Sequence, residues 1–166
     1  MNYCIDTNTL IHSWRFWYTR QTHPTLWEAL ADLGHSGTLK MPEQVFQELG
    51  EREDALYEWC KDHKDLLVYQ ATDETEDAYR TLVNEYPSMA GGLGMGSDYA
   101  DLYVVAVAMV TRATVVTDED LGFKFDPNRK KRSLKNFKIT NICFEQGIPL
   151  IRIYDILRNE GWVFTH

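Results

Sequence analysis

The stretch Tyr3-Cys4-Ile5-Asp6-Thr7-Asn8 decides the fold that we expect for this chain. A short apolar run that ends on an acid, followed by Thr and Asn and then by an amphipathic segment, is typical of a buried strand that leads into a helix. Such a strand places Asp6 at the lip of a sheet, which is where open α/β sheets bind ligands. The chemistry of the site then depends on which other acids meet Asp6 there.

Further apolar segments with the length of strands alternate along the chain with segments of helical spacing. This alternation predicts a three-layer α/β/α fold with a mostly parallel central sheet of four to five strands. No repeat or linker divides the chain, so one domain is expected over residues 1–166. The expected strands after the first are 38–41, 66–69, 113–117 and 150–153. The expected helices are 8–18, 26 to about 34, 43–50, 54–64, 72–86, 98–111, 139–146 and a last one to about 160.

The composition is that of an ordinary globular protein, with 44% hydrophobic and 25% charged residues in 166. No apolar run approaches the length of a membrane span, and the first residues look structural, so we expect a cytoplasmic protein without a signal peptide. Cys4, Cys60 and Cys143 are odd in number and widely spaced among mostly apolar neighbours. Buried, reduced thiols are therefore expected in place of disulfides or a zinc site.

The formal net charge of −8 argues against nonspecific binding of nucleic acid by the whole surface. It does not exclude a nuclease, because divalent cations neutralise a carboxylate cluster and substrate contact can be confined to a local basic patch. The segment 123–137 has little apolar periodicity and is expected to be an exposed loop. The basic residues from Lys124 to Lys138 could follow phosphates, or they could simply be a solvated segment.

Two predicted strands end on acids, at Asp6 and at Asp118-Glu119-Asp120, and parallel strands bring their carboxyl ends to the same edge of a sheet. Asp98 and Asp101 share one helix face. Negative groups gathered there would repel one another unless a divalent cation lies between them. Oxygen ligands without His or Cys favour Mg²⁺ or Mn²⁺ over zinc. Such a site can activate water and stabilise the leaving oxygen of a phosphodiester.

Each acid also has a structural interpretation. Asp6 could be a helix cap, and Asp98 in a first helical turn could simply complement the helix dipole. Asp101 is harder to explain in this way, because an apolar stretch that should point inward follows it directly. Glu48 alone would be a solvated helix residue, and only its combination with the other acids gives it a role.

Four segments, in their order and spacing, resemble those of PIN domains. They are Tyr3–Ile11, Val45–Leu49, Asp101–Ala108 and Val115–Glu119. The tail Lys138–Leu150, with the basic segment before it, is similar more narrowly to the DUF4411 branch of PIN-like proteins. The resemblance covers nearly the whole chain. It implies a PIN-like fold and a Mg²⁺- or Mn²⁺-dependent ribonuclease of the kind that serves as toxin in bacterial toxin-antitoxin pairs.

The resemblance also implies roles for individual residues. It places the first acid of the site at Asp6, the second at Glu48 and the third at Asp101. It gives Asn8, or alternatively Thr7, the role of orienting Asp6 or a bound water. The implied partners are an RNA substrate, an antitoxin protein and a second copy of the chain in a homodimer, with no membrane.

The fourth acid is ambiguous. In the commoner PIN pattern an Asp stands two residues after the Thr, and here that position is Glu119, flanked by Asp118 and Asp120. We favour Glu119 as the fourth acid, followed by Asp118. Asp98 could contact the metal ligands without binding the metal itself. The expected metal ligands are Asp6, Asp101, Glu119, Asp118 and Asp98. The residues expected to contact the substrate are Thr117, Arg129, Lys130, Lys131 and Arg132.

Other functions compete with this interpretation. A phosphatase of the haloacid dehalogenase type also begins with an Asp after its first strand, but its general acid would fall on Asn8, which cannot act as an acid. The glycines of segment 91–96 lack the Lys and the preceding strand of a phosphate-binding loop. A catalytically inactive PIN-like module that binds RNA or protein is the third alternative. The aromatic residues Trp14, Phe16, Trp17 and Tyr18 could stack bases, pack in the core or anchor a partner.

Overall fold

A central sheet of five parallel strands organises the computed structural model, which describes residues 1–87, 89, 99–119 and 138–164. The strands lie in the order β3-β2-β1-β4-β5, and each neighbouring pair is parallel. Their bounds are β1 Tyr3–Ile5, β2 Leu39–Pro42, β3 Val68–Tyr69, β4 Thr114–Val116 and β5 Leu150–Ile151. The parallel α/β sheet predicted from the sequence is confirmed.

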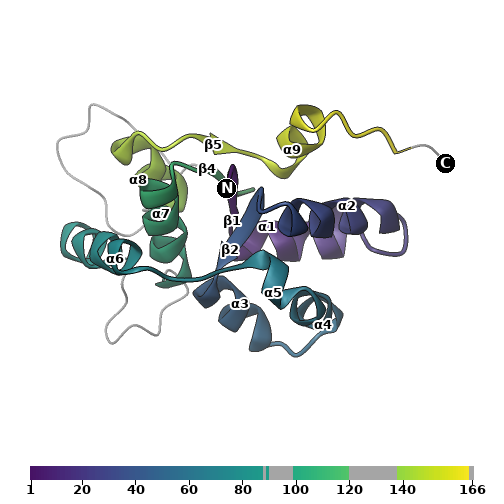
Figure 1. The fold of residues 1–166 in the computed structure, drawn as a ribbon, viewed down its shortest axis with the longest axis horizontal. Helices are drawn as coiled ribbons and strands as arrows, with labels where there is room; N and C mark the ends of the chain where they lie inside the picture. Colours follow the sequence, from purple (N-terminus) through teal and green to yellow (C-terminus); the bar gives the residue numbers. More distant parts are fainter. Residues whose placement is uncertain (88, 90–98, 120–137, 165–166) are drawn as a thin grey trace.

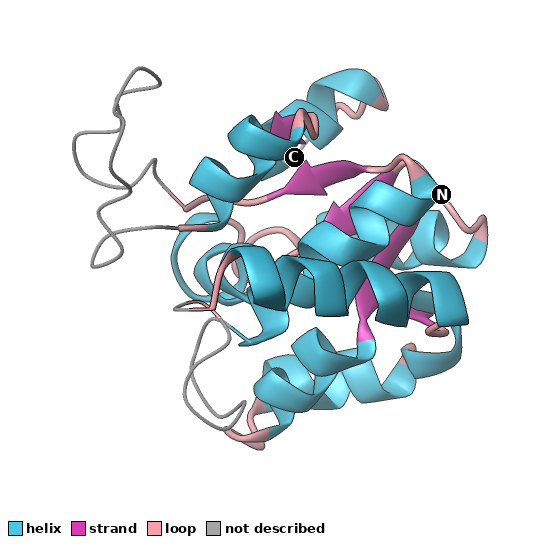
Figure 2. Ribbon diagram, turned by 90° about the vertical axis from the view of Figure 1, so that its left-hand side faces the viewer, coloured by secondary structure: helices cyan, strands magenta, loops and turns pink. Residues whose placement is uncertain are grey.

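Helices connect the strands, because parallel neighbours can be joined only by crossovers. In Figure 1, α7 and α8 lie on one side of the strands and α1 and α2 on the other. Cyan helices cover the magenta strands on the side that faces the viewer in Figure 2. This is the predicted three-layer arrangement. The bounds are α1 Thr7–His12, η1 Ser13–Trp17, α2 Pro24–His35, α3 Glu43–Gly50, α4 Ala55–Asp62, α5 Lys64–Leu67, α6 Asp73–Glu85, α7 Tyr99–Thr111, α8 Ile139–Gln146 and α9 Ile153–Asn159.

Helix α7 forms the centre of one helical layer. Its residues from Ala100 to Ala108 are all buried, as expected for a helix that is apolar on every side. It packs against β1, β2 and β4 and also against α3, α6 and α8. The same helix carries Asp101 in its first turn, so the burial that stabilises the fold also brings this acid inside.

Two strand predictions are too long, and the differences have a local cause. The amides of Leu66 and Leu67 both donate to the carbonyl oxygen of His63, at 3.0 and 2.9 Å, so these residues close the turn of α5. A short apolar run fits a buried helical turn as well as a strand. The last strand stops at Ile151 because the amide of Arg152 donates to Oδ2 of Asp155 at 3.0 Å, which starts α9.

The first predicted helix is split into α1 and the π-helical turn η1. The amide of Tyr18 donates to the carbonyl oxygen of Ser13 at 2.8 Å, which is the wider spacing of a π-helix. The sequence does not indicate this change of spacing. Helix α6, by contrast, begins at the predicted cap, since the hydroxyl of Thr72 accepts from the amide of Thr75 at 3.3 Å.

The three cysteines are free and buried, as the sequence predicts. Among the helices of the described residues, none combines the length and the apolar character that crossing a lipid bilayer requires.

Candidate active site

Asp6 lies where β1 ends beside β4. Ile5 pairs with Val116 in the sheet register, so the next residues, Asp6 and Thr117, come side by side. The hydroxyl of Thr117 donates to Oδ2 of Asp6 at 2.5 Å. Oδ1 of Asp6 accepts from the amide of Thr9 at 2.9 Å and thereby caps α1. Asp6 therefore lies at the lip of the sheet, as predicted, and its carboxylate also caps α1.

The segment after β4 brings two more acids to this edge, and hydroxyl groups hold it. Oγ1 of Thr9 accepts from the amide of Asp118 at 2.9 Å, and Oγ1 of Thr117 accepts from the amide of Glu119 at 3.1 Å. The guanidinium of Arg152 donates to the carbonyl oxygens of Thr117 and Glu119 at 3.1 and 2.7 Å. The backbone that carries both acids is thus tied to α1 and to the end of β5.

Within the part of the chain that the structure describes, one oxygen each of Asp118 and Glu119 accepts no hydrogen bond. Oδ1 of Asp118 accepts from the amide of Ile153 at 3.3 Å, and Oε1 of Glu119 lies 2.9 Å from the ammonium of Lys138. Oδ2 of Asp118 and Oε2 of Glu119 are buried and accept no hydrogen bond from any described residue. Buried carboxylate oxygens are rarely left in this state, so a cation, a water or a substrate group is the natural partner for them.

Glu48 and Asp101, the second and third predicted acids, are carried by helices α3 and α7. The hydroxyl of Thr7 donates to Oε2 of Glu48 at 2.6 Å, which links the helix that follows Asp6 to the second predicted acid. Asp101 is buried. Burial raises the pKa of the Cys143 thiol to about 12, and the charges of Asp6 and Asp101 add to the increase. Asp6 and Asp101 therefore act on the same thiol from nearby positions.

The carboxylate of Asp6 is only 1% exposed and is destabilised by its surroundings. Burial raises the pKa of Asp6 to about 6, against the hydrogen bonds from Thr117 and Thr9, which lower it. The charge of Glu119 raises it further. Burial also raises the pKa of Asp118, whereas the amide of Ile153 and nearby cationic groups oppose that shift. Negative charge at this edge is costly unless a cation neutralises it.

The structure describes some of the predicted site residues and not others. Asn8 lies in the first turn of α1 and is partly exposed, and its predicted orienting role stays a prediction. The hydroxyl of buried Thr117 is engaged by Asp6 and Glu119, so it positions these acids, and its predicted contact with substrate is not tested. The remaining predicted residues lie outside the described part of the chain and are Asp98, Asp120, Arg129, Lys130, Lys131 and Arg132.

The donor chemistry of this edge fits a divalent cation. The available atoms are carboxylate oxygens, which Mg²⁺ and Mn²⁺ prefer, and Oε2 of Glu119 is buried with no donor among the described residues. Across residues 1–87, 89, 99–119 and 138–164, no group of three or more His, Cys, Asp or Glu side chains is arranged to hold a metal ion. The predicted ligand set therefore stays a prediction, supported by the charge and by the unpaired oxygens.

Sequence reasoning missed the residues that hold the acids in place. Thr9 binds the amide of Asp118, Arg152 binds two carbonyl oxygens, and Lys138 pairs with Glu119. Thr9 stands close to Asp6 in the sequence and could have been found as a hydroxyl in the same helical turn. The partners of Arg152 and Lys138 depend on how β5 and α8 pack, and the sequence shows neither.

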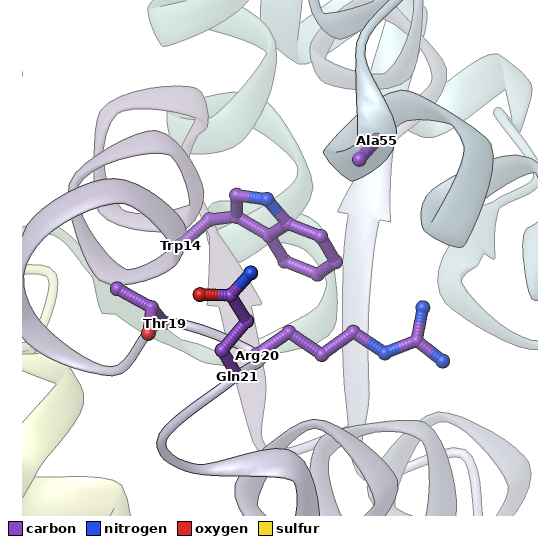
Figure 3. A pocket seen from close by; sticks show the side chains of 5 residues that line it. All are labelled: Trp14, Thr19, Arg20, Gln21 and Ala55. Carbon is purple, nitrogen blue, oxygen red and sulfur yellow. The ribbon is translucent and has the colours of Figure 1, made fainter.

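The aromatic residues of η1 have different surroundings. Trp14 is partly buried and packs edge-on against the core residue Trp27, with ring centroids 4.6 Å apart. Phe16 and Trp17 are 68% and 65% exposed, which leaves them free to contact another molecule. In Figure 3 the Trp14 ring lies beside Gln21 and Arg20. The Trp14 ring lines a cavity of about 440 Å³, whose lining residues are Trp14, Thr19, Arg20, Gln21 and Ala55. None of the predicted acids is among these lining residues.

The whole chain can be placed in a family. Residues 3–164 match the model of the family described as Domain of unknown function (DUF4411). The chain belongs to the DUF4411 family. The match covers both the segment that carries Asp6 and the tail that carries Lys138. No curated protein sequence matches the chain.

Two solved structures are similar to this DUF4411 protein. One is the 2.2 Å resolution structure of VapBC-1 from nontypeable Haemophilus influenzae, with a TM-score of 0.51, 14% identity, and 92% of this chain and 98% of that chain covered. The other is the crystal structure of VapBC2 from Rickettsia felis bound to a DNA fragment from their promoter, with a TM-score of 0.49, 17% identity and the same coverage. The first likeness supports the fold, which is PIN-like, as the sequence predicts.

Proposed function

We propose that this DUF4411 protein is a divalent-metal-dependent endoribonuclease that hydrolyses RNA phosphodiester bonds. One observation carries the proposal, which is the carboxylate of Asp6 at the sheet edge. It is buried and held by Thr117 and Thr9, and burial together with the charge of Glu119 raises its pKa to about 6. A protein that served only as a scaffold would gain stability by replacing such an acid with a neutral residue.

We propose a role for each of the predicted acids. We assign Asp6, Glu48, Asp101 and Glu119 to the metal site, with Asp118 as an adjacent acid. When bound, Mg²⁺ or Mn²⁺ would lower the pKa of a water molecule and stabilise the leaving oxygen. Other residues hold these ligands in place: the hydroxyl of Thr7 holds Glu48, while that of Thr117 holds Asp6 and the amide of Glu119.

The proposed reaction is a simple hydrolysis. The oxygen of a water molecule forms a bond to phosphorus, the bond from phosphorus to the leaving ribose oxygen breaks, and that oxygen ends with one proton of the water. No side chain forms a covalent intermediate. This distinguishes the proposal from a phosphatase of the haloacid dehalogenase type, in which the first Asp is the nucleophile and the residue at Asn8 would be the acid.

The biological setting is part of the proposal. The resemblance to PIN ribonucleases that act as toxins favours a cytoplasmic toxin held by an antitoxin protein, and a homodimer is compatible with it. The exposed rings of Phe16 and Trp17 on η1 offer an aromatic surface of the kind that anchors protein partners. The basic residues Arg129, Lys130, Lys131 and Arg132 are proposed to contact RNA.

Metal dependence gives the first test. We expect the purified protein to cleave a mixed pool of structured and single-stranded RNA with Mn²⁺ or Mg²⁺, and cleavage to fall to background when a chelator is added. Cleavage should return when the metal is restored in excess, which shows that the chelator did not unfold the protein. Gel analysis of end-labelled RNA measures the products.

Three other results would contradict the proposal in different ways. Cleavage that the chelator leaves unchanged would exclude a metal-dependent mechanism. RNA binding without cleavage under any metal would favour the inactive binding module. Release of phosphate from a small ester, with a covalent adduct on Asp6, would favour the phosphatase.

A further inference from the structure

A lysine forms an ion pair with one of the proposed metal ligands. The ammonium of Lys138 lies 2.9 Å from Oε1 of Glu119. The Glu119 side chain is only 17% exposed, whereas that of Lys138 is 44% exposed. An ion pair between two exposed side chains stabilises a protein little, but here one partner is an acid set into the candidate site.

The backbone on both sides of this ion pair is fixed. The amide of Lys138 donates to Oδ1 of Asn141 at 2.8 Å, and Asn141 is buried in the first turn of α8. Helix α8 packs against α7, which carries Asp101. On the other side, Thr117 and Arg152 hold the backbone of Glu119. The approach of the ammonium to the carboxylate is therefore built into the fold.

We propose that Lys138 is a positioning residue that holds Glu119 in the metal-free protein and competes with the divalent cation for that carboxylate. The inference rests on the proposed function, because it assigns Glu119 to the metal site. A divalent cation bound to Glu119 would repel an ammonium at hydrogen-bond distance from the same carboxylate. We expect Lys138 to move away from Oε1 when a cation binds the buried Oε2 of the same carboxylate, and the ammonium can then meet the phosphate of an RNA strand.

The competition explains how the protein tolerates its acids without metal. The hydroxyl of Thr117 joins Asp6 to the backbone of Glu119, so two residues with like charges lie close together at the sheet edge and repel each other. An ammonium on Glu119 offsets part of this repulsion. The same ammonium weakens metal binding, because it repels a cation that binds the same carboxylate. Removing Lys138 should thus have opposite effects on stability without metal and on affinity for metal.

The test is the affinity of the full chain for Mn²⁺, measured by titration calorimetry without RNA. Lys138→Met keeps the apolar stem and removes the charge. We expect it to bind Mn²⁺ about threefold to tenfold more tightly than the wild type, from the usual strength of partly exposed and charge-assisted pairs. Lys61→Met is the matched control, since Lys61 pairs with Glu58 at 3.5 Å on an exposed helix face. It should leave the affinity unchanged.

A double-mutant cycle separates a direct contact from a general change of charge. Glu119→Gln should weaken Mn²⁺ binding, and adding Lys138→Met to it should then have little effect. Thermal unfolding gives a second readout. Without metal, Lys138→Met should melt at a lower temperature than the wild type, and Mn²⁺ should raise its melting temperature by more than it raises that of the wild type.

The outcomes are distinguishable. Mn²⁺ binding that Lys138→Met leaves unchanged or weakens overturns the inference alone. An equal gain in the Glu119→Gln background also overturns it, because the effect would then come from net charge. If neither folded protein binds Mn²⁺, the metal-dependent function fails, and the role of Lys138 fails with it.

Discussion

Replacing Asp6 by Asn is expected to reduce metal-dependent RNA cleavage by about a hundredfold to a thousandfold, the usual cost of removing one group that stabilises charge in an active site. The substitution preserves size and shape, and the amide oxygen can still accept from the amide of Thr9, so α1 keeps its cap. What disappears is the negative charge at the centre of the proposed metal site. Single-turnover cleavage of end-labelled RNA in saturating Mn²⁺ measures the loss.

Asp62→Asn is the matched control for this substitution. Asp62 is exposed at the end of α4, so the same change of charge and shape occurs away from the sheet edge. Its cleavage rate should stay within about twofold of the wild-type rate. If Asp6→Asn is folded by circular dichroism and retains most of the wild-type cleavage rate, Asp6 is not part of the metal site. Equal losses of cleavage rate in Asp6→Asn and Asp62→Asn would also contradict the proposal.

The second large effect concerns stability in the absence of metal. The pKa of Asp6 is about 6 in the folded protein, whereas an exposed Asp in the unfolded chain has a pKa of 3.8. This difference corresponds to about 3 kcal/mol between the charged and the protonated form of the carboxyl. The folded pKa is raised, so the contribution of Asp6 to stability is fully present below pH 3.8 and is lost as the pH rises through about 6. At pH 8 the buried charge therefore destabilises the wild type.

Asp6→Asn should remove this penalty. In a chelator, we expect the variant to have a higher free energy of unfolding than the wild type at pH 8, by up to about 3 kcal/mol, with the difference shrinking toward zero near pH 4. Urea unfolding at several pH values measures it. At pH 8, the exposed substitution Asp62→Asn should change the free energy of unfolding by no more than about 0.5 kcal/mol. A variant that is less stable at pH 8, or a difference that does not change with pH, would show that Asp6 is not held in an unfavourable charged state.

The two effects of Asp6→Asn together separate function from folding. A residue retained for the fold alone would lose stability when replaced, and activity would fall with it. Here the prediction is greater stability without metal and lower activity with metal. Asp6 would then be an acid that the fold accommodates at a cost.

Much of the fold could be predicted from local patterns. The apolar run before Asp6, the Thr72 cap and the apolar stretch after Asp101 each depend on neighbouring residues, and each is where the sequence places it. The strand ends near Leu66 and Ile153 were wrong because a few apolar residues suit either a strand or a buried helical turn. The π-helical spacing after Ser13 has no signature in the sequence.

For the candidate site, the sequence predicts the acids but not the side chains that hold them in place. The sequence indicates that Asp6 and the acids after Thr117 share a sheet edge, because parallel strands end on the same side. It does not indicate that Thr117 donates to Asp6, or that Lys138 pairs with Glu119, since these contacts join distant segments through side-chain geometry. The choice of the fourth acid among Asp118, Glu119 and Asp120 stays a prediction.

Anomalous diffraction from crystals grown with Mn²⁺ shows whether a divalent cation binds among these carboxylates. We expect a peak at about 2 Å from carboxylate oxygens of Asp6 and Glu119, with Asp101 or Glu48 as further ligands. In the same crystals, the ammonium of Lys138 should have left Oε1 of Glu119. A fully ordered site without a peak would contradict the proposed metal site, and so would Mn²⁺ bound elsewhere while Lys138 remains on Glu119.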